Sequence, residues 1–93
     1  MNLEVIKRAA AAHHVKRLEL FGSAARGETP KDYDFLVVFE PLPPLEHGRA
    51  YFALLEELQG MLDKPVDLIE VEALKNPYFL RGIEADRMLV YGA

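Results

Sequence analysis

The chain has 93 residues, a formal net charge of −4, no cysteine and 51% hydrophobic residues. These totals predict one small domain, residues 1–93, and exclude disulfides, thiolate metal sites and a cysteine nucleophile. A general nucleic-acid binder needs a basic surplus, so we expect no direct nucleic-acid binding. The N-terminus lacks a signal-peptide pattern and no apolar run reaches membrane-spanning length, so we expect a soluble cytoplasmic protein without membrane contact.

Helices and strands are predicted to alternate in the first half of the chain. Residues 2–14 carry apolar side chains at helical spacing, and residues 17–21 alternate as in a short strand. Ser23 suits the N-cap of a brief helix through residues 24–26. Residues 32–39 read DYDFLVVF and form the strongest predicted strand, because their second part is continuously apolar.

The same alternation continues in the second half. A long helix is predicted over residues 45–62, followed by a strand at 65–71, a helix from 76 to about 85 and a strand at 88–91. The apolar stripe expected to face the core from the long helix consists of Leu45, Phe52, Leu55, Leu58 and Leu62. This order predicts an α/β (α+β) fold, with a small mixed β-sheet of about four strands and helices packed on one face.

Two aspartates stand one residue apart where the strongest strand begins. Side chains at i and i+2 of a strand point to the same face, so Asp32 and Asp34 project together. Two close carboxylates are costly unless a cation lies between them. Magnesium prefers a few carboxylates plus phosphate oxygens, so the pair predicts a metal site completed by a phosphate-bearing substrate. Solvated residues at a strand entrance are the alternative.

The segment GSAARG before the aspartates fits a phosphate ligand. Gly22 lets the backbone approach a ligand closely, and the N-terminus of a helix offers free N–H groups to phosphate oxygens. The Ser23 hydroxyl adds a donor, and Arg26 adds a charged, forked one. The alternatives are an ordinary turn and cap for Gly22 and Ser23, and an ion pair with Glu28 or an aspartate for Arg26.

Asp67 is the candidate for a third carboxylate. It lies in an apolar strand, where an unpaired buried charge would be expensive. If this strand pairs beside that of Asp34, three carboxylates converge and suit two ions roughly 3.5–4 Å apart. Asp67 would also help to deprotonate an attacking hydroxyl. The alternative is a strand-edge aspartate paired with a lysine or a helix N-terminus.

The combination of GSAARG, a short spacer and DYDFLVVF resembles the nucleotidyltransferase signature of the DNA polymerase β superfamily. Size and layout are most similar to its minimal nucleotidyltransferases, the antitoxin partners of HEPN-domain toxins. The resemblance implies a polymerase β-like nucleotidyltransferase fold. It also implies a triphosphate site at Gly22 and Ser23, with Arg26 at the motif arginine, and magnesium bound by Asp32, Asp34 and Asp67.

The same resemblance implies an enzyme that moves AMP from ATP onto a hydroxyl, often of a tyrosine, in a partner HEPN toxin. Two Mg²⁺ ions would be cofactors, and a hetero-oligomer with the toxin is expected. Lys31, Tyr33 and Phe35 depart from the serine, isoleucine and leucine that are frequent at these positions. A non-catalytic antitoxin that neutralises a toxin by binding and a small-molecule nucleotidyltransferase remain alternatives.

Overall fold

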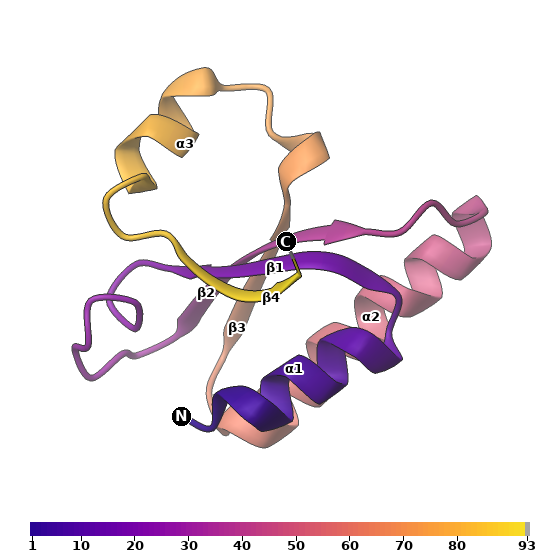
Figure 1. Cartoon of the computed structure of the whole chain (residues 1–93), viewed down its shortest axis with the longest axis horizontal. Coiled ribbons are helices and arrows are strands. Elements are labelled where there is room, and N and C mark those ends of the chain that lie inside the picture. The colour runs from indigo at the N-terminus through magenta and orange to yellow at the C-terminus, as the bar shows by residue number, and fades with distance from the viewer. Residues whose placement is uncertain (93) are drawn as a thin grey trace.

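The computed structural model describes residues 1–92, which form one four-stranded sheet and the helices around it (Figure 1). The elements are α1 (Leu3–Ala12), β1 (Val15–Phe21), β2 (Tyr33–Phe39), α2 (Pro44–Leu62), β3 (Val66–Glu70), the 3-10 helix η1 (Val71–Ala73), α3 (Pro77–Ile83) and β4 (Met88–Gly92). The predicted class and the four-stranded mixed sheet are confirmed. Within residues 1–92, each helix is too short or too polar to span a bilayer.

The strand order of the sheet is β3-β2-β1-β4. β1 runs antiparallel to both β2 and β4, whereas β2 and β3 are parallel. A parallel pair requires a crossover connection, which α2 supplies. The register places Asp34 opposite Phe21 on one side and opposite Asp67 on the other. The end of β1 and the starts of β2 and β3 therefore meet at one corner of the sheet.

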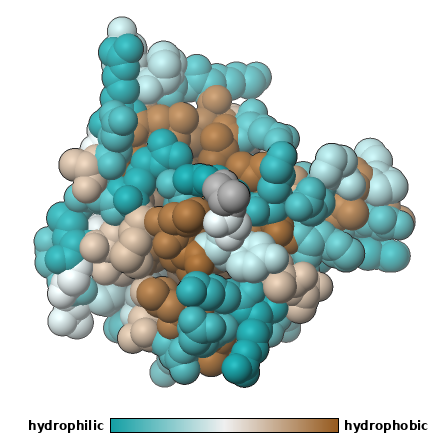
Figure 2. All heavy atoms as spheres, in the orientation of Figure 1, coloured by the Kyte–Doolittle hydropathy of each residue, from teal (hydrophilic) through white to brown (hydrophobic). Residues whose placement is uncertain are grey.

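The two longer helices, α1 and α2, lie together on one face of the sheet, and the short α3 lies on the other side (Figure 1). The core between the sheet and the two longer helices contains the fully buried side chains of Ile6, Leu18, Leu20, Phe35, Leu54 and Leu58. On the other side, hydrophobic side chains are visible between α3 and the strands (Figure 2). Strand residues that alternate away from the core therefore face the side of α3.

The apolar stripe predicted for α2 is wrong at two positions. Leu45 and Phe52 are 67% and 66% exposed, whereas Ala50, Leu54 and Leu58 are buried. The buried residues are spaced by four and share one helix face. One of these buried residues is a small alanine, Ala50, and a pattern built on large side chains misses it.

The brief helix predicted after Ser23 is replaced by a run of turns. The N–H of Arg26 donates to the carbonyl of Gly22 at 3.2 Å, and the N–H of Glu28 donates to the carbonyl of Ser23 at 3.0 Å. These bonds span four and five residues, so they do not repeat as a helix does. Glycines with φ of 76° and 78°, Gly22 and Gly27, bound the segment and turn the chain back toward β2.

Candidate functional site

The corner of the sheet brings the predicted aspartates together. Asp34 and Asp67 are paired in register on adjacent strands. Their neighbours Phe35 and Leu68 are buried in the core, so both aspartates alternate toward the opposite face, where α3 lies. Asp32 comes directly before β2. The sequence left the pairing of β2 with β3 as a condition, and the parallel pairing places Asp67 beside Asp34.

The Asp34 carboxylate lies in an unfavourable electrostatic environment. Burial raises the pKa of Asp34, and the negative charges of Asp32 and Asp67 raise this pKa further. Asp34 is half-buried, while its two acidic neighbours are exposed. A carboxylate in this position is costly by itself, and a cation bound beside it would remove the repulsion. The arrangement thus favours binding of positive charge.

Asp67 differs from the prediction in its surroundings. The sequence suggests a buried charge among apolar neighbours, but Asp67 is exposed, because β3 is an edge strand whose second face is open at this corner. The cost of burial therefore says nothing about the role of Asp67. Its place in register with Asp34 is what connects it to the site.

Gly22 couples the turn after β1 to Asp34. Its φ is +76°, and a Cβ atom built on it would lie 2.6 Å from Oδ2 of Asp34. Real Cβ atoms do not approach an oxygen so closely, so the carboxylate occupies space that any side chain at position 22 would fill. Two local features therefore require glycine at this position of the GSAARG motif: the left-handed backbone and the carboxylate beside it.

A metal ion fits the donors of this corner but is not held by a preformed cage. Within residues 1–92, no group of three His, Cys, Asp or Glu side chains forms a cluster that could hold a metal ion by itself. Magnesium takes one or two carboxylates and completes its shell with water and substrate phosphates. Oxygen donors of like charge around Asp34, beside a glycine that leaves room for its carboxylate, match that preference.

Arg26 is engaged by carboxylates. Its Nε donates to Oε2 of Glu28 and its Nη1 donates to Oδ2 of Asp86, both at 2.8 Å. The hydrogen bond to Glu28, followed by that to Asp86, raises the pKa of Arg26. The ion-pair alternative considered from the sequence is therefore present. Asp86 lies 60 residues away in the chain, and no local pattern could have indicated it. A phosphate contact of Arg26 stays a prediction.

A second unpredicted feature is a buried carboxylate, Glu19, on the same face of the sheet. Its side chain is held by Arg87, which precedes β4, and by Arg17. Glu19 is one of two charged positions in the alternating segment RLELF, on the side opposite Leu18 and Leu20. Its burial depends on tertiary packing, which brings Arg87 from a distant part of the chain to bond with it.

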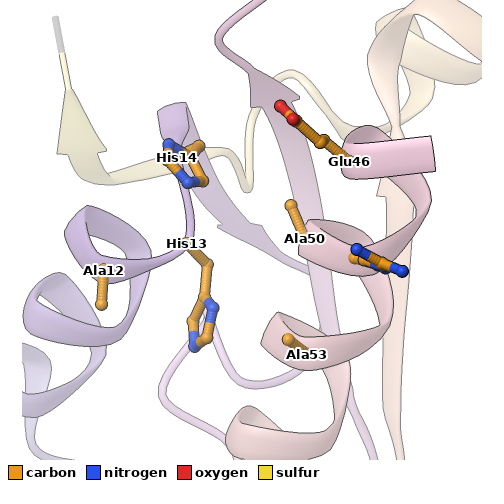
Figure 3. A pocket seen from close by; sticks show the side chains of 7 residues that line it. Ala12, His13, His14, Glu46, Ala50 and Ala53 are labelled. Atoms are coloured by element: carbon orange, nitrogen blue, oxygen red, sulfur yellow. The ribbon is translucent and has the colours of Figure 1, made fainter. Parts of the chain in front are cut away.

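A pocket of about 280 Å³ lies between the end of α1 and the start of α2, away from the aspartates. Figure 3 shows His13 and His14 on one side of it and Glu46, Ala50 and Ala53 on the other. His14 directly precedes β1 and Gly22 directly follows it, so the pocket and the aspartate corner lie at opposite ends of this strand. The pocket is therefore separate from the candidate site.

Comparisons with known proteins agree on one family. The profile of the nucleotidyltransferase domain matches residues 3–90. A relative from Methanocaldococcus jannaschii, named as a protein adenylyltransferase, is 38% identical over 82 residues, which cover 84% of this chain and 79% of the relative.

Solved structures show the same fold. A structure named as a minimal nucleotidyltransferase is 31% identical, with a TM-score of 0.66 over 92% of this chain and 86% of its own. The structure of a tri-AMPylated Shewanella oneidensis HEPN toxin in complex with MNT antitoxin contains a chain that is 17% identical. That match has a TM-score of 0.61 and covers 99% of this chain and 74% of the other. The chain described here therefore belongs to the nucleotidyltransferase domain family.

Proposed function

We propose that this chain, as one minimal domain of residues 1–93, transfers AMP from ATP to a tyrosine hydroxyl of a partner HEPN-domain toxin and so acts as its antitoxin. The observation that carries the proposal is the corner where Asp34 lies against Gly22 and between Asp32 and Asp67. The family match and the fold shared with a toxin-bound antitoxin support it.

The acidic side chains are assigned to the metal. Asp32, Asp34 and Asp67 would hold two Mg²⁺ ions, whose chemistry is to neutralise the phosphates and the charge that develops on the leaving pyrophosphate. The raised pKa of Asp34 supports this role, because a bound cation would stabilise the ionised carboxylate that burial and its neighbours destabilise.

The turn after β1 is assigned to the triphosphate. Within residues 1–92, the backbone bonds of the turn use the amides of Arg26, Gly27 and Glu28, and no backbone acceptor pairs with the amides of Ser23 and Ala24. Free amides beside a small residue suit phosphate oxygens. Ser23 would add its hydroxyl, and Arg26 would donate through Nη2, the nitrogen that its bonds to Glu28 and Asp86 do not use.

The proposed reaction is an in-line displacement at the α-phosphorus of ATP. The acceptor oxygen forms a bond to phosphorus as the bond to pyrophosphate breaks, and the proton of the acceptor hydroxyl passes to a carboxylate, which we assign to Asp67. Exposure of Asp67 suits this role, because an acceptor on another protein has to reach it. A stable complex with the toxin would position the acceptor.

Release of pyrophosphate from ATP, with Mg²⁺ and a purified HEPN-domain partner, tests the proposal. Asp34→Asn should lower the rate by a factor of about 100 or more, since a metal-binding carboxylate is removed. Asp63→Asn is the matched control, because Asp63 is exposed, ends α2 with a φ of 52° that asparagine tolerates, and lies outside the corner. Full activity of Asp34→Asn would refute the assignment.

A further inference from the structure

Side-chain pairs attach the segment of residues 77–87, which contains α3, to β1 and the following turn at three places. Phe79 packs edge-on against Phe21, with ring centroids 5.8 Å apart. Asp86 is bonded to Arg26 at 2.8 Å. Arg87 is bonded to Glu19. In the sequence, Gly22 and Ser23 lie between the attached residues Glu19 and Phe21 on one side and Arg26 on the other.

The bond between Glu19 and Arg87 is the more buried of the two polar attachments. Glu19 is 4% exposed. Nε of Arg87 donates to one carboxylate oxygen at 3.0 Å, and Nη2 donates to the other at 2.7 Å, so the pair is bidentate. Nε of Arg17 donates to Glu19 at 3.0 Å. Two parallel bonds fix orientation as well as distance.

These polar bonds help to fix the position of the segment, in addition to the ring contact between Phe79 and the buried Phe21. None of the residues of α3 is buried. A buried ion pair is a costly way to gain stability, and apolar side chains of similar size often do as well or better. What a bidentate pair adds is a defined geometry, here between the residue before β4 and the strand that leads into the Gly22 turn.

We propose that Glu19 and Arg87 are positioning residues for nucleotide binding. They hold the connection from α3 to β4 against β1 and, through the neighbouring bond of Asp86 to Arg26, keep the turn at Gly22 and Ser23 in the shape that receives the phosphates. Neither residue touches the substrate. The inference rests on the proposed function. It attributes part of the affinity of the site for ATP to the contact between β1 and the residue before β4.

Two variants test the link, with Glu4→Gln as the control, since Glu4 forms an exposed ion pair with Lys7 on α1. Glu19→Gln should raise the KM for ATP about tenfold, because a charged buried hydrogen-bond acceptor is lost. Asp86→Asn should raise it about threefold, as expected for an exposed ion pair. In both variants kcat should stay within about twofold, because no group that acts in the transition state is removed.

Hydrogen exchange of residues 22–28 in the ligand-free protein supplies a readout that does not depend on activity. Both variants should exchange faster there than wild type, and Glu4→Gln should not. Asp86→Asn decides the question if Glu19→Gln does not fold, since Asp86 lies near the surface.

Three results separate the possibilities. Unchanged KM and exchange in both variants, with an active wild type, would overturn the positioning role alone. A lower KM in Asp86→Asn would also overturn it, because Asp86 would then be withholding Arg26 from phosphate. Absence of ATP binding by wild-type protein would refute the proposed function itself.

Discussion

Replacing Gly22 by alanine should disable the site through a single added carbon. The new Cβ would lie 2.6 Å from Oδ2 of Asp34, and the φ of +76° is a conformation that side chains rarely adopt. The backbone strain alone costs about 1–2 kcal/mol. Relief of the clash must move either the turn or the Asp34 carboxylate, and a displacement of about 1 Å near reacting groups costs roughly 100-fold in rate.

Gly27→Ala separates strain from clash, because Gly27 has nearly the same φ, +78°, but no atom within 4 Å of the added Cβ. Both variants should lose about 1–2 kcal/mol of unfolding free energy from strain, measured by urea denaturation. Only Gly22→Ala should lose AMP transfer by about 100-fold, measured as initial rates at saturating ATP. Equal activity of the two variants would refute the claim that Gly22 makes room for the Asp34 carboxylate.

The remaining predictions concern stability. Asp34→Asn should raise the melting temperature near pH 7, because the folded state raises the pKa of Asp34 and so penalises its ionised form; the gain should disappear near pH 3, where Asp34 is protonated in both states. Arg87→Ala should cost about 3 kcal/mol in urea denaturation, since Glu19 would stay buried with Arg17 as its remaining bonded partner. Because Arg87 lowers the pKa of Glu19, wild-type protein should lose stability as pH falls through that lowered pKa, and Glu19→Gln should flatten this acid limb. Leu54→Ala should cost about 3 kcal/mol at a fully buried position, whereas Phe52→Ser, 66% exposed, should change stability by less than about 0.5 kcal/mol.

Local patterns predict much of this fold, because the hydrophobic spacing within each segment indicates its secondary structure. Strand alternation and the paired aspartates placed Asp34 at the entrance of β2, and the apolar strand around Asp67 indicated β3. The sequence predicts a helix after Ser23, because a capping residue and alanines favour one. The structure has a run of turns there instead, between Gly22 and Gly27, which both have positive φ.

Contacts between distant segments could not be predicted from the sequence. Glu19 and Arg87 are 68 residues apart, so no local pattern indicates that they pair. Whether Asp67 is buried depends on what covers an edge strand, which the residues of that strand do not encode. The sequence predicts that Asp67 lies beside Asp34 only if their two strands pair. The parallel register between Asp34 and Asp67 meets that condition.

The most direct measurement of the central claim is the intact mass of a purified HEPN-domain partner after incubation with this protein, ATP and Mg²⁺. We predict a gain of one or more AMP groups with wild-type protein and with Asp63→Asn. We predict no gain with the double variant Asp32→Ala/Asp34→Ala, whose fold is checked by circular dichroism. An unmodified partner held in a tight complex by wild-type protein would contradict AMP transfer and leave neutralisation by binding as the function.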